Sequence, residues 1–151
     1  MIDWTRKPVA ALIRHMDQHT SQAAETLFAR HGGSRPIYFI LLALHEKDRT
    51  TQRELAAVVD LREATLSEHL RVMAERDLIT RYRPPENQRT QQIALTERGT
   101  ELFTTLRTAI EDFDAHVRAA AGTEADLALL YEMGPRIAAA ADEYIGRTTG
   151  N

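Results

Sequence analysis

The sequence predicts a mainly α-helical fold with one small β-hairpin. Apolar residues recur every three or four positions through most of the 151 residues, and a strand-like pattern occurs only near residues 79–95. Hydrophobic residues make up 43% and aromatic residues 6% of the chain, a composition typical of a foldable, helix-rich domain. Because the chain contains no cysteine, disulfide scaffolds, thiolate zinc sites and cysteine nucleophiles are excluded.

The N-terminal third predicts two helices. Apolar positions from Val9 to Leu27 indicate a long amphipathic helix that follows Pro8 and ends at residues 31–33. A second helix is expected over residues 37–45, with Ser34 or the following Arg-Pro pair at its start. This second helix is apolar nearly all round, which favours a central position in the core.

Two shorter helices are expected next. Thr51 and Glu54 have the spacing of a capping box, and the short helix behind them is interrupted for about one turn at residues 60–62. The run that follows carries Leu66, Leu70 and Met73 on one face and ends near Asp77. These spacings predict a pair of helices joined by a tight turn.

The pattern then changes to that of a hairpin followed by long helices. Residues 79–83 and 91–95 have strand-like composition, and the proline-rich residues 84–88 between them predict a turn. A long helix is expected to begin at residues 96–99, and a last helix at residues 123–126. Helix, tight turn, helix and hairpin form a winged helix-turn-helix, the wing being the hairpin.

This arrangement predicts DNA binding, because the second helix of such a pair fits the major groove and the wing reaches toward the minor groove. If Leu66, Leu70 and Met73 face the core, small and charged side chains face outward. Arg71 is then suited to a guanine or a phosphate, and Glu68 to a cytosine amino group. The DNA-contacting residues expected from the helix and its start are Arg62, Ala64, Thr65, Ser67, Glu68 and Arg71, and those from the wing are Arg81, Arg83, Asn87 and Arg89.

Several of these segments resemble the MarR family of transcription regulators. The resemblance runs from about residue 37 to 99 and includes Leu55-Ala56, residues 66–81, and Arg89 followed by Leu95-Thr96-Glu97-Arg98-Gly99. Where the family usually has Asp-x-Arg in its wing, this chain has Asn87-Gln88-Arg89, so the arginine is kept and the carboxylate is an amide.

The resemblance implies one domain over residues 1–151. Residues 8–33 and 99–147 would form long N- and C-terminal dimerisation helices, and residues 34–98 the DNA-binding lobe. It further implies a homodimer on an inverted-repeat operator, acting as a repressor, and release from DNA by a small aromatic or organic anion. Such a ligand is expected nearest Met16, His19, Tyr38 and Phe39, although methionine and aromatic residues at helical spacing also suit an ordinary core.

Other classes of protein find little support in the sequence. His15 and His19 have the i, i+4 spacing of some zinc ligands, but no third ligand is evident, and no cofactor is indicated. His31-Gly32-Gly33-Ser34 looks like an oxyanion-hole segment, yet no Gly-x-Ser-x-Gly elbow accompanies it, so we expect no enzyme. No signal peptide or membrane-spanning run is evident, and a cytoplasmic location is expected.

The distribution of charge limits where DNA can bind. Residues 99–151 carry four basic and nine acidic side chains, a net of −5, whereas residues 48–98 carry nine of each. An acidic C-terminal part repels nucleic acid, so any DNA contact is expected from the middle of the chain. The alternative is a winged-helix module that binds protein and not DNA, and the arginines of the wing favour DNA.

Overall fold

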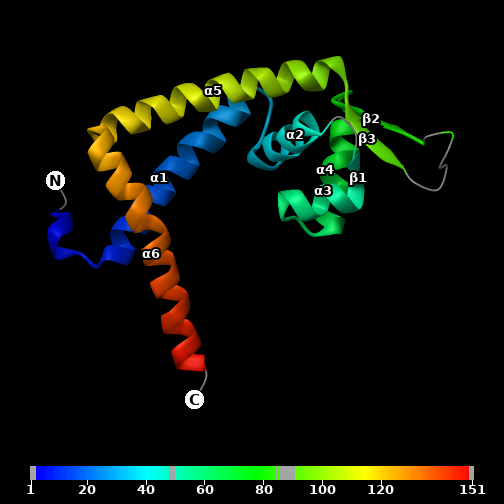
Figure 1. Ribbon diagram of the computed structural model, residues 1–151. Coiled ribbons are helices and arrows are strands. Elements are labelled where there is room, and N and C mark those ends of the chain that lie inside the picture. The colour runs from blue at the N-terminus through cyan, green and yellow to red at the C-terminus, as the bar shows by residue number, and fades with distance from the viewer. Residues whose placement is uncertain (1–2, 48–49, 84, 86–90, 150–151) are drawn as a thin grey trace. The chain divides into compact units, whose positions relative to one another are not determined.

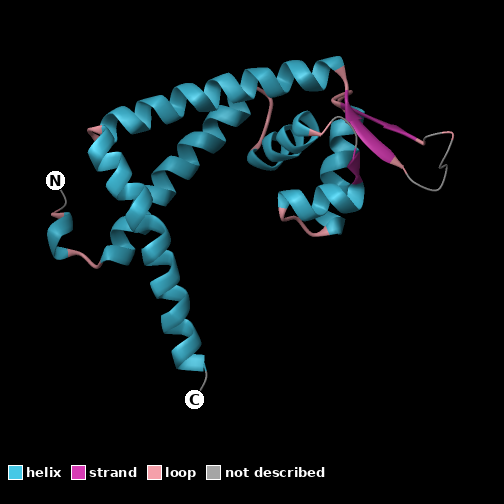
Figure 2. Cartoon of the chain, in the orientation of Figure 1, coloured by secondary structure: helices cyan, strands magenta, loops and turns pink. Residues whose placement is uncertain are grey.

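The computed structural model describes residues 3–47, 50–83, 85 and 91–149. The chain forms two compact units, residues 1–110 and residues 111–151. Helices dominate both units, and the strands belong to the first (Figures 1 and 2). In chain order the elements are η1 (Trp4–Arg6), α1 (Val9–Arg30), α2 (Arg35–Glu46), β1 (Thr50–Thr51), α3 (Gln52–Val59), α4 (Glu63–Glu75), β2 (Ile79–Tyr82), β3 (Gln92–Leu95), α5 (Glu97–Ala121) and α6 (Glu124–Thr149).

A tight turn joins α1 to α2. Gly32 has a φ of +75°, a left-handed conformation that glycine adopts without steric penalty. The amide of Gly33 donates to the carbonyl oxygen of Phe28 at 2.8 Å and so ends α1. The hydroxyl of Ser34 accepts a hydrogen bond from the amide of Ile37 at 3.4 Å and caps α2. The sequence left the start of this helix open between Ser34 and the following Arg-Pro pair, and in the structure the N-cap is Ser34.

The core of the first unit is built around α2. Ile40, Leu41 and Leu44 on this helix are at most 1% exposed, and α2 contacts α1, α3, α4 and β3. The central position expected from its apolar composition is therefore confirmed. The side chains buried to below 2% exposure come from five elements and from the residue before β2, and they are Phe103, Ile40, Leu41, Leu44, Leu55, Leu66, Leu70, Met73, Leu78, Ile93 and Leu106.

The helix pair α3–α4 begins with the capping box that the sequence predicts. The hydroxyl of Thr51 accepts from the amide of Glu54 at 3.2 Å, and the carboxylate of Glu54 accepts from the amide of Thr51 at 2.8 Å. Asp60, at φ 51°, ends α3 in the left-handed conformation, and Arg62 is the N-cap of α4. Residues 60–62 thus form the one-turn interruption between the two helices.

The three strands form an antiparallel sheet of order β1–β3–β2. In the wing, Ile79 pairs with Leu95 and Tyr82 with Gln92. On the other side of β3, Thr50 pairs with Ile93. The sequence predicted only the hairpin, so β1 is an additional strand, and it ties the start of α3 directly to the wing (Figure 1).

Thr96 attaches α5 to the chain just before β2. Its hydroxyl donates to the carbonyl oxygen of Asp77 at 2.6 Å, and its amide donates to the carbonyl oxygen of Leu78 at 3.2 Å. The same hydroxyl accepts from the amide of Gly99 at 3.0 Å, which makes Thr96 the cap of α5. One residue therefore sets both the end of the hairpin and the start of the long helix.

The second unit consists of the end of α5 and all of α6. Thr123 and Asp126 form a reciprocal cap, in which the amide of Thr123 donates to the Asp126 carboxylate at 2.8 Å and the amide of Asp126 donates to the Thr123 hydroxyl at 3.3 Å. Leu127 is the buried hydrophobic residue of α6 among those that the structure describes. Large hydrophobic side chains are exposed along the rest of this helix, namely Leu129, Leu130, Tyr131, Met133, Ile137, Tyr144 and Ile145.

Candidate nucleic-acid interface

Helix α4 presents a polar face opposite its buried stripe. Leu66, Leu70 and Met73 are 0% exposed, as the sequence predicts, and they anchor the helix against the core. Because neighbouring positions of a helix point about 100° apart, this anchoring turns Ala64, Thr65, Glu68 and Arg71 to the outside, and all four are exposed. The small side chains at 64 and 65 leave the first turn of α4 open to close approach by a ligand.

Ser67 lies at the edge of this face and is half-buried. Its hydroxyl oxygen accepts a hydrogen bond from Nε2 of Gln52 at 2.6 Å, which links α4 to the first turn of α3. The DNA contact expected of Ser67 stays a prediction, and the structure shows that this residue joins the two helices. Gln52 carries no local sequence signal for this contact, because the two residues are 15 positions apart.

Arg71 is held by two carboxylates on its own helix. Its Nη2 and Nε atoms donate to the two oxygens of Glu68 at 2.6 and 3.1 Å, and its Nη1 atom donates to Glu75. Hydrogen bonds to Glu68 and then to Glu75 raise the pKa of the Arg71 guanidinium, and the hydrogen bond from Arg71 lowers the pKa of Glu68. The part played by Glu75 was not anticipated from the sequence.

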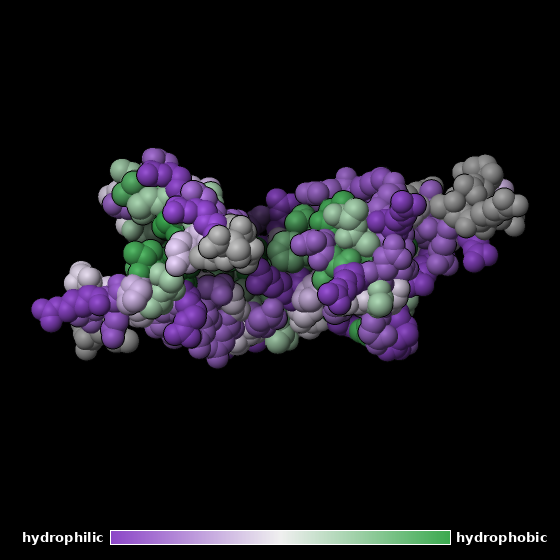
Figure 3. Space-filling view, turned by 90° about the horizontal axis from the view of Figure 1, so that it is seen from below, coloured by the Kyte–Doolittle hydropathy of each residue, from purple (hydrophilic) through white to green (hydrophobic). Residues whose placement is uncertain are grey.

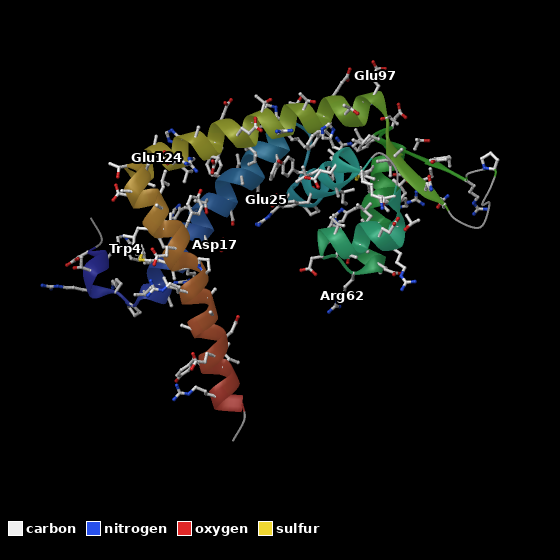
Figure 4. The ribbon with its side chains drawn as sticks, viewed as in Figure 1. Trp4, Asp17, Glu25, Arg62, Glu97 and Glu124 are labelled. Carbon is white, nitrogen blue, oxygen red and sulfur yellow. The ribbon has the colours of Figure 1, made fainter. Side chains whose placement is uncertain are left out.

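Arg62 lies at the start of α4. It is exposed and is the N-cap residue, but its side chain makes no capping hydrogen bond. Figure 4 shows it at the end of the lobe formed by α3 and α4, pointing away from the helices. No ion-pair partner for it is found among the residues that the structure describes, so its charge is available to a phosphate.

The wing supplies further basic side chains. Arg81 in β2 and Arg83 just after it are exposed, whereas Ile79 at the root of the strand is buried. The hydroxyl of Tyr82 donates to Oε1 of Gln92 and holds the two strands together between these arginines. Asn87 and Arg89, which the sequence analysis also assigned to DNA, lie outside the described residues.

The four residues expected near a small ligand do not gather in one place. Tyr38 stacks between Phe28 and Phe103, with ring centroids 5.3 and 6.1 Å away, so it packs against the core. Phe39 is 43% exposed and lines a cavity of about 310 Å³ between α2 and α3. Met16 and His19 lie on α1 and are not part of its lining.

The cavity between α2 and α3 is apolar with acidic residues among its lining. Figure 3 shows hydrophobic surface over this part of the molecule. Glu46 and Asp60 line it together with Leu42, Ala43, Val58, Val59 and Phe39, and its lining contains no basic side chain. Such a cavity repels a negatively charged molecule.

On α1, His19 packs edge-on against His15, with ring centroids 4.4 Å apart, and the ring of Trp4 lies 4.6 Å from that of His15. Within the described residues no group of three or more metal-binding side chains occurs. Among the residues that the structure describes, no helix is long and apolar enough to cross a membrane.

Comparison with known proteins agrees with this geometry. Residues 34–90, which include α2, the helix pair and the first strand of the wing, match the model of the MarR family. Over this segment the chain is similar to the MarR family. The curated relative that matches is described as a transcriptional regulator, which is the class of protein that the sequence predicts.

Relatives of this chain include the uncharacterized HTH-type transcriptional regulator YhbI of Bacillus subtilis, 32% identical over 66 residues. That match covers 44% of this chain and 43% of YhbI, so the similarity spans less than half of the relative.

Solved structures of the same fold cover nearly whole chains. A mutant of MepR from S. aureus has a TM-score of 0.76 at 18% identity, covering 88% of this chain and 98% of MepR. A mutant of MarR from E. coli complexed with operator DNA has a TM-score of 0.72 at 15% identity, covering 89% and 96% of the two chains. PcaV from Streptomyces coelicolor, in complex with its natural ligand, has a TM-score of 0.70 at 24% identity, covering 93% and 98%. The predicted fold class, mainly α with a winged helix-turn-helix, is confirmed.

Proposed function

We propose that this protein is a transcription regulator, a repressor that binds double-stranded DNA as a homodimer on an inverted-repeat operator. The observation that carries the proposal is the exposed polar face of α4 above three fully buried residues, Leu66, Leu70 and Met73. In this arrangement α4 enters the major groove, and the strands β2 and β3 extend along the neighbouring backbone toward the minor groove. Arg62, Arg81 and Arg83 supply positive charge for phosphates.

Exposed apolar side chains support the homodimer. Among the described residues, ten of the twelve exposed large hydrophobic side chains belong to α1 and α6, the exceptions being Phe39 and Val58. Apolar surface of this extent on two long helices favours association, because burial removes it from water. A two-fold dimer in turn matches an inverted repeat, since each copy would meet one half-site. A cytoplasmic location, with access to DNA, is part of the proposal.

The second candidate is a module that binds protein and not DNA. It is favoured by the charge of α4, on which Glu63, Glu68 and Glu75 outnumber Arg71. The exposed arginines on and next to β2 favour the regulator instead, because a wing that binds an apolar or basic partner has no need of guanidinium groups.

We further propose that a small aromatic or organic anion releases the protein from DNA. It is supported by the similarity of residues 34–90 to the MarR family and by the likeness to PcaV, whose solved structure contains that protein's natural ligand. We place the anion away from the cavity between α2 and α3, because Glu46 and Asp60 line that cavity without a basic side chain.

The test is selection of duplexes from a random DNA pool by the full chain, followed by mobility-shift titration at two salt concentrations. A regulator is expected to enrich an inverted repeat, and its affinity for that repeat should fall as salt rises. Recovery of no enriched sequence, together with no binding to any duplex, would instead support the protein-binding module. Aromatic carboxylates and phenols are then added to the DNA complex, and an effector must lower the affinity for DNA.

A further inference from the structure

The exposed face of α4 carries an arginine between two carboxylates. Glu68 lies three positions before Arg71 and Glu75 four positions after it, and the side chains are 62%, 55% and 60% exposed in chain order. Glu68 holds the guanidinium in a two-pronged arrangement through Nε and Nη2, and Glu75 takes the remaining Nη1 atom. The only guanidinium of α4 is thus engaged on both sides before any DNA arrives.

The net charge of this face is negative, which disfavours DNA binding. Two carboxylates and one guanidinium leave a net of −1, and Glu63 in the first turn adds another negative charge. A helix of this charge is repelled by the phosphates that line both edges of the major groove. Nonspecific attraction to DNA must therefore come from basic side chains outside α4, such as Arg62 and the wing arginines.

The ion pairs are exposed, so exchange of partner by Arg71 is inexpensive. Exposed pairs of this kind contribute between zero and about 1 kcal/mol. A guanine edge, which accepts two hydrogen bonds from one guanidinium, replaces Glu68 without loss of geometry. The carboxylates that remain near the DNA then need hydrogen-bond donors, which base edges such as the cytosine amino group supply and phosphates do not.

We propose that Glu68 and Glu75 are specificity-determining residues, which compete with phosphates for Arg71 and release it to a base edge that accepts its two-pronged hydrogen bonds and whose neighbours donate to the freed carboxylates. The inference rests on the proposed function and deepens it, since it assigns a role to acidic residues on the DNA-reading helix. It also accounts for the charge that otherwise favours the protein-binding alternative. Glu68 and Glu75 act through Arg71 and are positioning residues in this role.

The test compares wild type with Glu75→Gln and Glu68→Gln, using the selected operator and a scrambled duplex of equal length at the same salt. For Glu75→Gln we expect affinity for the scrambled duplex to rise about fivefold and affinity for the operator to change less than about twofold, so that the ratio of the two falls. Glu101→Gln on α5 is the matched control, because it removes one exposed carboxylate outside α4 and should leave the ratio unchanged. Thermal melts confirm that each variant is folded.

A double-mutant comparison separates the effect of the ion pairs of Arg71 from general repulsion between the carboxylates and DNA. In an Arg71→Ala background the added effect of Glu75→Gln on the ratio is expected to disappear, because there is no guanidinium left to withhold. The inference would be overturned if the full effect persisted in that background, or if Glu75→Gln raised the affinity for both duplexes equally. Either result would leave the proposed DNA-binding function standing. Failure of the wild type to bind any duplex would instead reject the proposed function, and the inference with it.

Discussion

The carbonyl oxygen of Leu78 occupies the space that a side chain on Gly99 would need. A Cβ built on residue 99 would lie 2.0 Å from that oxygen and 3.0 Å from the carbonyl carbon. The close approach brings the first turn of α5 against the chain just before β2, where Thr96 already bonds to the carbonyl oxygens of Asp77 and Leu78. The Leu-Thr-x-x-Gly pattern of residues 95–99 is thus a packing requirement of the junction between the hairpin and the long helix.

Replacing Gly99 by alanine is expected to destabilise the protein, because backbone and not a flexible side chain must move. Overpacking of this kind costs about 1–3 kcal/mol, and a backbone clash belongs at the upper end. The free energy of unfolding is measured by urea titration. Gly134→Ala is the matched control: apart from its chain neighbours and the backbone of its own helix, no atom lies within 4 Å of its Cβ, so no overpacking cost of this kind is expected. Equal effects of the two substitutions would contradict this account of Gly99.

The capping box of α3 predicts a pH-dependent contribution to stability. The hydrogen bond from the backbone of Thr51, followed by those from Lys47 and the Thr51 hydroxyl, lowers the pKa of Glu54 from 4.5 to about 2. Because the folded pKa is the lower one, the stabilisation is present above pH 4.5 and is lost as the pH falls toward 2. NMR titration of the Glu54 carboxyl should give this value directly.

Glu54→Gln should accordingly show a smaller loss of stability than wild type between pH 4.5 and pH 2, when melting temperatures are compared across that range. The control is Glu101→Gln, since Glu101 is an exposed carboxylate in the interior of α5, away from the helix caps. An unchanged pH dependence in Glu54→Gln would mean that the cap contributes nothing to acid sensitivity.

The wing is expected to contribute affinity for DNA without contributing to the core. Arg81→Ala and Arg89→Ala should each weaken operator binding by about 1–3 kcal/mol and make its salt dependence shallower. Melting temperatures should stay unchanged, because Arg81 is exposed and Arg89 belongs to a polar stretch of the sequence. Mobility-shift titrations at several salt concentrations measure both quantities. Unaltered affinity together with an unaltered salt slope would argue against contact between the wing and DNA.

Association through α1 is expected to depend on its exposed apolar stripe. Ile13 is 42% exposed and lies on α1 with Val9 and Met16, which are exposed to 61% and 45%. Ile13→Glu should shift the dimer toward monomers at micromolar concentration in sedimentation equilibrium, because a carboxylate cannot be buried unpaired at an interface. Gln18→Glu adds the same charge at an exposed polar position of the same helix and should leave the dimer intact. A wild-type protein that sediments as a folded monomer would refute the proposed assembly.

Local periodicity was sufficient to predict the helices, the capping box at Thr51 and the buried face of α4, because each depends on residues within one or two turns. Contacts between distant segments left no such signal. Strand β1 is two residues long, and Thr50 pairs with Ile93, 43 positions later, so no local pattern marks it. The hydrogen bond between Gln52 and Ser67 was missed for the same reason.

Within the candidate site, the helical orientation of α4 was predictable and the ion pairs of Arg71 were overlooked. The i, i+4 spacing of Arg71 and Glu75 was visible in the sequence, and applying the pairing rule for helices would have revealed it. Tyr38 and Phe39 were grouped although consecutive helix residues point about 100° apart. In the structure Tyr38 stacks on the core and Phe39 faces the cavity between α2 and α3.

Thr51 belongs to two elements at once, since it pairs with Gln92 in the sheet and caps α3. No linker separates the strand register from the helix cap. A slip of one residue between β1 and β3 would turn every side chain to the opposite face and would also unwind the first turn of α3. A displacement of the hairpin on DNA is therefore expected to be passed directly to the start of α3, because Thr51 leaves no connecting segment between the strand and the helix.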